Sequence, residues 1–402
     1  TTPRSAATSP PNADRIAIRE RPARKSIRMT NPVAIRSLRA FSYRYPLQTP
    51  VETSFGRMLD RPAVFIRIEG NDGHVGWGEA WSNFPSVGAE HRARIVNEII
   101  APAVTGFVAN TPHDLFDHLS TTYAVLALQT GEHGPFAQSI AGIDIAMWDL
   151  AARRQAQPLW RLLGGDAPRI NVYASGINPA GAERTAEAAL RAGHRALKLK
   201  IGFGAERDIA NLTALRALAG DDLIAADANQ GWSLEQALAF APELDRFSLA
   251  WLEEPLRADQ PWPAWLELKK RIRTPLAGGE NIAGQAAFTE AFAAGALDVI
   301  QPDIAKWGGF SQCVAVGRAA RAAGKRFCPH YLGGGIGLLA SAHLLAAVGG
   351  DGLLEVDFNP NPLRDALCGP VGDVRDGSIT LTDAPGLGVS PDLAAFEAYR
   401  TA

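Results

Sequence analysis

From residue 170 onward the sequence repeats one unit, a short apolar run rich in β-branched residues followed by a longer stretch of helical periodicity. The polar residues that close these runs are 23 to 27 positions apart: Lys200, Asp227, Glu253, Glu280, Asp303, His330 and Glu355. Strand and helix alternating at this period are typical of parallel βα units, and eight such units form a barrel of about 250 residues. We therefore predict an α/β fold built on a TIM-type (β/α)7β barrel over residues 166–375.

The carboxyl ends of the strands are where the active site lies in barrels of this type. A single polar residue there is a weak signal, because it can cap the next helix or face solvent in a loop. The stretch "ALKLKIG", with Lys198 and Lys200 on one face, would by itself indicate an edge strand with a solvated lysine face. Seven ionisable strand ends in register would instead converge on one mouth, which favours a functional site.

Residues 29–165 do not follow the repeat. The runs "PAVFIRIEG" and "HVGWGEAW" flank an Asn-Asp-Gly turn and predict a β-hairpin, and helical segments follow it. This pattern indicates an α+β domain that precedes the barrel, and we expect residues 376–402 to return to that domain. Residues 1–28 are rich in Ser, Thr, Pro and Arg without an apolar stripe, which predicts a disordered N-terminal extension.

The composition excludes several classes of partner. The net charge of −2 leaves no electrostatic footprint for nucleic acid or an anionic membrane, so we expect neither as a partner. No apolar run approaches the roughly 20 residues that a membrane-spanning helix needs. The three cysteines have no metal-binding spacing and favour a reducing compartment, and hence a cytoplasmic location.

Three consecutive strand ends carry only carboxylates: Asp227, Glu253 and Glu280. Each alone would most simply be a surface or ion-paired group, but three like charges at one mouth repel unless a cation lies between them. Oxygen ligands without Cys or His favour Mg²⁺, with Mn²⁺ as a substitute. We therefore predict a metal site here, and by strand alternation we expect Glu254 to point away from the barrel interior.

Candidate bases flank this predicted metal. Lys198 and Lys200 should lower each other's pKa, which moves a lysine toward the neutral form that can accept a proton. On the opposite strands, Asp303 can orient His330, although a lone buried histidine is more often structural. Glu355 closes the last strand and can donate a hydrogen bond to a substrate or serve a structural role. A metal with two opposed bases suits removal of the α-proton of a small-molecule carboxylate, with the metal stabilising the enediolate.

The motifs "KLKIG", "DANQGW", "WLEEPL", "AGGEN", "PDIAKWGG" and "CPH" resemble, in this order and spacing, the enolase superfamily and specifically its mandelate racemase subgroup. The resemblance spans about residues 30–400. It implies that residues 29–165 are a capping domain whose segment 49–59 closes over the substrate. We also expect a homo-oligomer.

Roles follow from this resemblance position by position. Asp227, Glu253 and Glu280 match the magnesium ligands, Lys200 the catalytic lysine and Lys198 its supporting lysine. Asp303 and His330 match the catalytic dyad, and Glu355 the acidic residue of the last strand. Asn229 and Lys306 match residues that contact substrate, and we expect Lys198, one layer deeper, to touch the substrate carboxylate as well. Asp303 argues against the muconate-lactonizing branch, which carries lysine there, whereas the loop "YLGGGIG" after His330 matches no subgroup of known substrate.

The resemblance leaves three readings of function. The first is a magnesium-dependent dehydratase of a sugar acid, which releases a 2-keto-3-deoxy acid. The second is a racemase or epimerase of a 2-hydroxy acid that uses Lys200 and His330 on opposite faces of the substrate. The third, a non-catalytic binding protein, would have little reason to keep seven converging polar strand ends.

Overall fold

The computed structural model describes residues 31–53 and 56–402, and the predicted extension over residues 1–28 lies outside them. The first domain contains a sheet in the order β3-β2-β1-β4. Its strands are β1 (Val33–Thr53), β2 (Gly56–Gly70), β3 (Val75–Ala80) and β4 (Val108–Ala109). β2 and β3 pair antiparallel across the Asn-Asp-Gly turn, so the predicted hairpin is confirmed.

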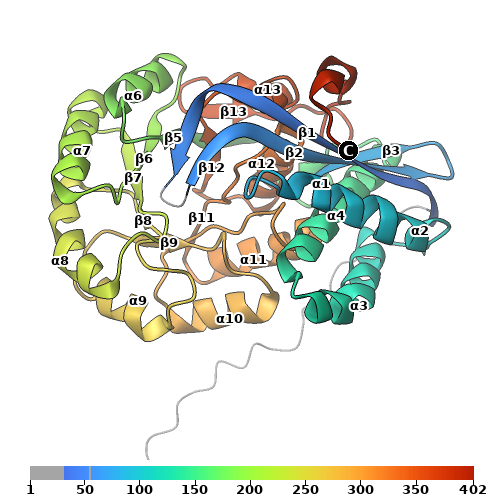
Figure 1. The fold of residues 1–402 in the computed structure, drawn as a ribbon, viewed down its shortest axis with the longest axis horizontal. Helices are drawn as coiled ribbons and strands as arrows, with labels where there is room; N and C mark the ends of the chain where they lie inside the picture. Colours follow the sequence, from blue (N-terminus) through green and yellow to red (C-terminus); the bar gives the residue numbers. More distant parts are fainter. Residues whose placement is uncertain (1–30, 54–55) are drawn as a thin grey trace, which may run out of the picture.

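Helices cover one face of this sheet (Figure 1). The main ones are α3 (Pro112–Thr130) and α4 (His133–Arg154), preceded by α1 (Gly88–Arg94), a π-helical turn (Ile95–Ile100) and α2 (Ala101–Val104). The side chain of Thr111 caps α3, and Gly131 at φ 69° ends it. Helix α4 is buried along nearly its whole length because it lies between this sheet and the second domain.

The second domain is a parallel sheet in the order β11-β10-β9-β8-β7-β6-β5-β12. Its strands are β5 (Arg169–Ile177), β6 (Ala196–Lys200), β7 (Leu223–Asp227), β8 (Leu252–Glu253), β9 (Leu276–Gly278), β10 (Val299–Ile300), β11 (Arg326–Phe327) and β12 (Leu353–Asp357). At the seam between β11 and β12, Leu353 N donates to Cys328 Sγ at 3.4 Å and Arg326 pairs with Asp351 at 2.9 Å.

One helix follows each of the first seven strands and lies on the outside of the sheet (Figure 1). These helices are α6 (Ala182–Arg191), α7 (Ala205–Ala219), α8 (Leu234–Leu244), α9 (Trp262–Lys269), α10 (Gln285–Ala294), α11 (Gly309–Ala322) and α12 (Gly335–Val348). The predicted (β/α)7β barrel with its preceding α+β domain is thereby confirmed. A separate apolar cluster, which includes Tyr173 and Trp251 in edge-to-face contact at 5.2 Å, fills the barrel interior.

The two domains share one hydrophobic core. Tyr43, Phe65 and Trp148 of the first domain belong to the same buried cluster as the outer layer of the barrel. The C-terminal segment adds further links, because β13 (Ser378–Thr380) pairs with β5 while Ala402 O accepts from Ser42 N of β1 at 2.9 Å. The Ala402 contact holds the middle of β1 against the C-terminal segment, and the long β1–β2 hairpin reaches across the strand ends of the barrel (Figure 1).

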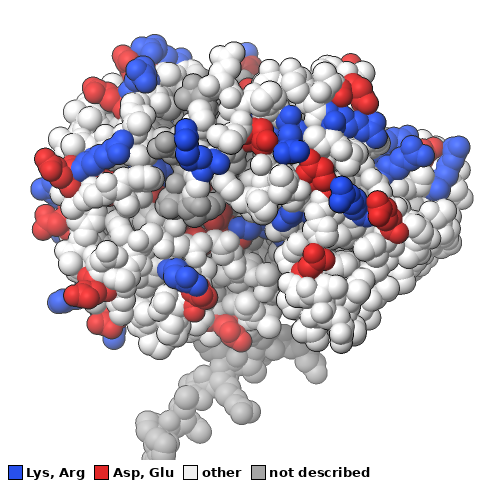
Figure 2. Space-filling view, viewed as in Figure 1, with Lys and Arg blue, Asp and Glu red and all other residues white. Residues whose placement is uncertain are grey.

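The distribution of charged side chains on the surface agrees with the net charge of −2. Figure 2 shows Lys and Arg side chains interspersed with Asp and Glu over the visible face. No helix in residues 31–53 and 56–402 is both long and apolar enough to cross a membrane.

The contact between β3 and α4 gives a test of this packing. A Cβ on Gly78 would overlap the carbonyl oxygen of Gly142 and lie 2.7 Å from Ala146 N. We expect Gly78→Ala to lower the free energy of unfolding by about 3 kcal/mol, because neither backbone can move without moving the other element. Urea unfolding measures the change. Gly134→Ala on the same helix is the control, since only the Gln138 side chain lies near, at 3.7 Å. Equal stability of Gly78→Ala and the control would contradict the close approach.

Candidate active site

A cavity of about 300 Å³ lies at the carboxyl ends of the barrel strands. The barrel contributes Lys200, Asn229, Glu280, Lys306, His330 and Glu355 to its wall, and the first domain contributes Val51, Met58, Arg61, Trp81 and Phe84. The cavity is therefore closed by both domains. Val51 and Met58 belong to the segment 49–59 that we expected near the substrate, although residues 54 and 55 lie outside the described part.

The two lysines of β6 occupy different depths. Lys198 is fully buried, and its Nζ lies 2.7 Å from Glu253, 2.8 Å from Glu355 and 3.6 Å from Asp227. The Lys200 side chain is 20% exposed and its Nζ lies 2.6 Å from Asp227 Oδ2. Lys200 thus faces the cavity, while Lys198 ties three strands together beneath it.

Lys198 does lower the pKa of Lys200 as expected, but the expected net shift of a lysine toward its neutral form is wrong for this arrangement. Burial lowers the pKa of Lys200, and so does the charge of Lys198, but Asp227 and Glu253 outweigh both and raise it. For Lys198, burial also opposes the charge, yet Glu253 and Glu355 raise its pKa well above the ordinary value. The pKa of each ammonium group is therefore raised, because carboxylates rather than the neighbouring lysine dominate the local field.

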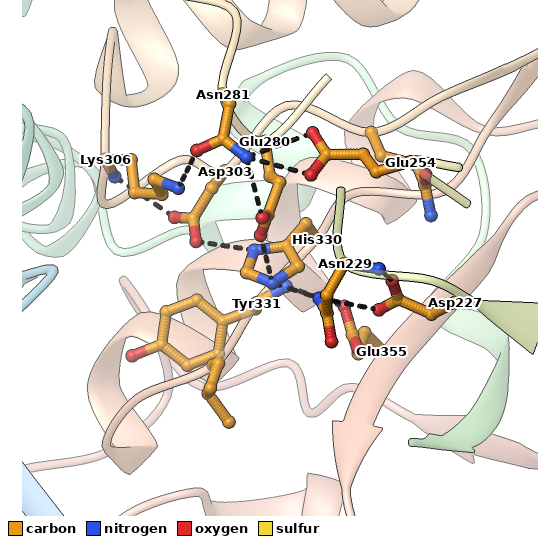
Figure 3. A network of polar contacts seen from close by, with 12 residues as sticks. Asp227, Asn229, Glu254, Glu280, Asn281, Asp303, Lys306, His330, Tyr331 and Glu355 are labelled. Carbon is orange, nitrogen blue, oxygen red and sulfur yellow. Dashed lines mark hydrogen bonds and ion pairs between the residues drawn. The ribbon is translucent and has the colours of Figure 1, made fainter. Parts of the chain in front are cut away.

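His330 and Asp303 form a hydrogen-bonded pair (Figure 3). His330 Nδ1 lies 2.8 Å from Asp303 Oδ2, and its Nε2 lies 2.6 Å from Glu280 Oε2. Burial lowers the pKa of His330, but Glu280 and Glu355 raise it well above the ordinary value. The second oxygen of Asp303 accepts from the backbone N–H groups of Ala305 and Lys306, at 2.8 and 3.1 Å. The carboxylate is thereby fixed to orient the imidazole.

The three predicted metal ligands come from neighbouring strands. Asp227 and Glu253 are register neighbours on β7 and β8, and Glu280 follows β9. Burial raises the pKa of Glu253 to about 7 despite Lys198. Burial raises the pKa of Asp227, but Lys200 and Lys198 bring it below the ordinary value. Burial also raises the pKa of Glu280, but His330 brings it well below the ordinary value.

All three carboxylates face a protein cation, and in the described ranges no three Asp, Glu, His or Cys side chains are arranged to hold a metal as they stand. The donor set itself, three carboxylates at one barrel mouth, fits a hard divalent cation such as Mg²⁺.

Glu254 does not point away from the mouth, as strand alternation led us to expect. β8 ends at Glu253, and Glu254 has a φ of 36°, so the alternation stops there. Both oxygens of Glu254 accept from Asn281 Nδ2 at 3.0 Å, and the same amide nitrogen lies 2.9 Å from Glu280 Oε1 (Figure 3). Asn281 Oδ1 in turn accepts from Lys306 Nζ at 2.8 Å. Sequence reasoning missed Asn281, although it directly follows the predicted ligand Glu280.

Of the predicted substrate contacts, Asn229 and Lys306 line the cavity, whereas Lys198 is fully buried beneath it. Lys306 Nζ lies 4.9 Å from the centre of the Trp81 ring, which joins it to the first domain. Asn229 has a φ of 44°, and its backbone N–H donates to Asp227 Oδ1 at 2.8 Å. Asn229 therefore both lines the cavity and orients the carboxylate of Asp227.

Glu355 lies in the middle of β12 rather than at its end, which corrects the sequence interpretation. The strand ends at Asp357, whose Oδ2 lies 2.9 Å from the buried guanidinium of Arg61 on β2. Arg61 and Asp357 both line the cavity. Neither belongs to the repeat of polar residues, and only the packing of the two domains brings them together.

Glu79 on β3 explains the glycine-rich loop after His330. Its Oε1 accepts from Gly334 N at 2.5 Å and its Oε2 from Gly337 N at 2.8 Å, at the start of α12. Burial raises the pKa of Glu79 from its ordinary value of 4.5 to about 7, against the effect of these two hydrogen bonds. No motif in the sequence marked this residue.

Comparison with known proteins identifies the family. Residues 35–164 match the family described as "Mandelate racemase / muconate lactonizing enzyme, N-terminal domain", and residues 181–395 match "Enolase C-terminal domain-like". The chain thus belongs to the mandelate racemase/muconate lactonizing enzyme family of the enolase superfamily.

Two curated relatives are enzymes that act on sugar acids or their lactones. A D-galactarolactone cycloisomerase of Agrobacterium fabrum is 30% identical, over 91% of this chain and 98% of its own. An arabinonate dehydratase of Saccharolobus solfataricus is 29% identical, over 84% of this chain and 90% of its own.

Two solved structures share the fold. A mandelate racemase/muconate lactonizing enzyme from Bordetella bronchiseptica is 54% identical with a TM-score of 0.87, covering 92% of this chain and 100% of its own. A racemase from Streptomyces coelicolor, solved with bound magnesium, is 27% identical with a TM-score of 0.81, covering 91% and 100%.

The raised pKa of Glu79 predicts a pH dependence of stability. The unfolded chain releases this proton near pH 4.5 and the folded chain near pH 7, so the stabilisation is complete below about pH 4.5 and is lost as the pH rises to about 7. The free energy of unfolding of the unaltered chain should fall over this pH range by on the order of 3 kcal/mol relative to that of Glu79→Gln, which cannot ionise. Urea unfolding at several pH values measures the difference. The exposed Glu98→Gln is the control, and a pH-independent difference for Glu79→Gln would contradict the assignment.

Proposed function

We propose that the chain removes the α-proton of a hydroxycarboxylate, and that the reaction is the magnesium-dependent dehydration of a sugar acid to a 2-keto-3-deoxy acid. The observation that carries this proposal is that Lys200 and His330 line one cavity, with Asp303 hydrogen-bonded to His330 behind it. Lys200 comes from β6 and His330 from the segment after β11, across the barrel from one another. An acid placed between them presents its α-carbon to one group and its β-hydroxyl to the other.

Asp227, Glu253 and Glu280 are the residues that would hold magnesium, with manganese as a substitute, because their oxygen donors suit a hard cation. When bound, the cation supplies positive charge that favours loss of a proton next to a carboxylate. The bound-magnesium racemase among the structural relatives supports this assignment.

The protein's own groups account for the proton transfers. A base, Lys200 or His330 in its unprotonated form, takes the α-proton and the C–H electron pair forms the C=C bond. The β C–O bond breaks, and His330 gives a proton to the departing hydroxyl, which leaves as water. The enol then tautomerises to the 2-keto-3-deoxy acid. Asp303 holds the imidazole in one orientation throughout.

The cavity wall supports a polyhydroxy substrate. Five amide side chains line it, and each offers both donors and an acceptor to hydroxyl groups: Asn178, Asn229, Gln230, Asn281 and Asn359. Lys198 lies below the cavity and supports Lys200 rather than facing the open space. The arabinonate dehydratase relative is consistent with an acid of this kind.

A racemase or epimerase of a 2-hydroxy acid is the second candidate, because Lys200 and His330 can also serve as bases on opposite faces of one α-carbon. The two reactions differ in product. Release of a 2-keto acid from a panel of aldonic and aldaric acids supports the dehydratase, whereas α-deuterium incorporation from D₂O without loss of the acid supports the racemase. The expected homo-oligomer stays a prediction.

Removal of the metal should abolish turnover. We expect chelation by EDTA to eliminate activity and added Mg²⁺ to restore it. Glu253→Gln should fail to bind Mg²⁺ in isothermal titration calorimetry, since a ligand charge is lost at the centre of the donor set. Glu290→Gln, on the outer helix α10, is the matched control. Full activity of Glu253→Gln without bound metal would exclude the proposed site.

Lys200→Arg and His330→Asn should each reduce kcat by at least about a hundredfold, because guanidinium and amide groups cannot accept the α-proton. Lys270→Arg, on the barrel surface, should leave kcat unchanged. Exchange of the substrate α-proton in D₂O shows which of the two residues removes it. The variant that lacks the acting base should lose this exchange, whereas the other variant can retain it. Near-normal turnover by either variant would refute the two-group mechanism.

A further inference from the structure

We infer that Glu79 and Asp144, two buried carboxylates of the capping domain, are positioning residues for the Asp303–His330 pair. Each holds one of the two loops on which the pair is carried. The inference rests on the proposed function, in which this pair acts as an acid and base. It assigns to the capping domain a part in catalysis other than covering the substrate.

Glu79 holds the loop that follows His330. It is 1% exposed, and its two oxygens accept from Gly334 N and Gly337 N in the first turn of α12. Between His330 and this turn, Tyr331 donates its hydroxyl to Gly334 O at 3.0 Å and its backbone N–H to Glu355 at 3.2 Å. The five residues from His330 to Gly334 are thus held by hydrogen bonds at both ends.

Asp144 on α4 holds the loop that follows Asp303. It is 2% exposed, and its Oδ2 accepts from Ser311 N at 3.0 Å and its Oδ1 from Ser311 Oγ at 2.5 Å, in the first turn of α11. Trp148 Nε1, one helical turn farther along α4, donates to the same hydroxyl at 3.0 Å. The carboxylate therefore meets α11 as Glu79 meets α12, where exposed N–H groups favour a negative or hydrogen-bond-accepting group.

Glycines make both approaches possible. A Cβ on Gly334 would lie 2.7 Å from Glu79 Oε1, and a Cβ on Gly309, which has a φ of 52°, would overlap the carboxylate of Asp144. The runs "GGGIG" and "WGGF" therefore leave room for carboxylates that arrive from another domain. This gives a physical reason for the glycine-rich loop after His330.

The short strands make this support necessary. β10 and β11 contain two residues each, so Asp303 and His330 lie beyond the regular ladder, and their backbones are joined by an isolated bridge. The segment after β3 adds two more contacts, because Trp81 N donates to Ala305 O at 3.2 Å and Asn83 Nδ2 donates to Leu332 O. Both loops are thus held from one side by one domain, and a displacement of either would change the imidazole–carboxylate geometry.

The Nδ1–H proton shared by His330 and Asp303 gives a readout that does not need the substrate. In ¹⁵N-histidine-labelled protein this proton should give a downfield resonance, identified by its loss in His330→Asn. We expect Glu79→Ala and Asp144→Ala each to abolish or broaden the resonance. Glu79→Gln and Asp144→Asn should retain the resonance in part, because each keeps one carbonyl acceptor. These two variants provide the test if an alanine variant does not fold.

Asp149→Ala is the matched control. Asp149 is a third buried carboxylate, on the same helix α4, but it accepts from Trp77 N at 2.8 Å and Leu387 N at 2.6 Å, away from both loops. We expect this variant to keep the resonance even where its melting temperature falls as far as that of the other two. An unchanged resonance in folded Glu79 and Asp144 variants, an equal loss in Asp149→Ala, or no resonance in the unaltered chain would overturn the inference.

Steady-state kinetics provide a second test of the positioning role. With an acid that the unaltered enzyme converts, Glu79→Ala and Asp144→Ala should lower kcat by about tenfold or more and change KM little, since a misplaced acid–base group slows the chemical step. Loss of the resonance together with unchanged kcat would refute the catalytic part of the inference. If the unaltered chain converts no acid in the panel, the proposed function fails while the resonance still reports whether the loops position the pair.

Discussion

Four buried carboxylates and the half-buried Glu280 lie at one end of the barrel, and the rest of the site follows from the need to compensate their charge. Asp227, Glu253, Glu280, Asp303 and Glu355 are close enough to interact, and isolated buried charges of one sign would be prohibitively costly. Lys198, Lys200 and His330 supply the opposite charge from within the same ring of strands. The carboxylates of this ring are the reason that the pKa of both lysines is raised.

These charged side chains are carried by short barrel strands. β8, β10 and β11 each contain two residues, and Glu280, Asp303 and His330 all lie just past strand ends. Precise placement therefore comes from side-chain and loop contacts rather than from the sheet ladder. The capping domain provides many of these contacts through Glu79, Asp144, Trp81 and Asn83, and a hydrophobic core shared by both domains keeps them in place.

Sequence reasoning reached much of the fold and the composition of the site. The spacing of Lys200, Asp227, Glu253 and Glu280 implied the parallel barrel, because only a regular strand–helix repeat places polar residues at that period. It failed where local geometry departs from the regular element. Glu254 breaks strand alternation with a positive φ, and Glu355 lies two residues before the end of its strand. The direction of the lysine pKa shifts was also wrong, since it depends on distances to several carboxylates that spacing does not give.

The sequence by itself determined which strands exist, their order, and the chemical types that meet at the barrel mouth, since periodicity and residue type are properties of the chain alone. Only the tertiary structure decided that Arg61 meets Asp357, that Asn281 links Glu254 with Glu280, and that Glu79 and Asp144 reach the loops after His330 and Asp303. These contacts join residues far apart along the chain, often from different domains. Their partners are selected by the packing of whole elements, which no local pattern encodes.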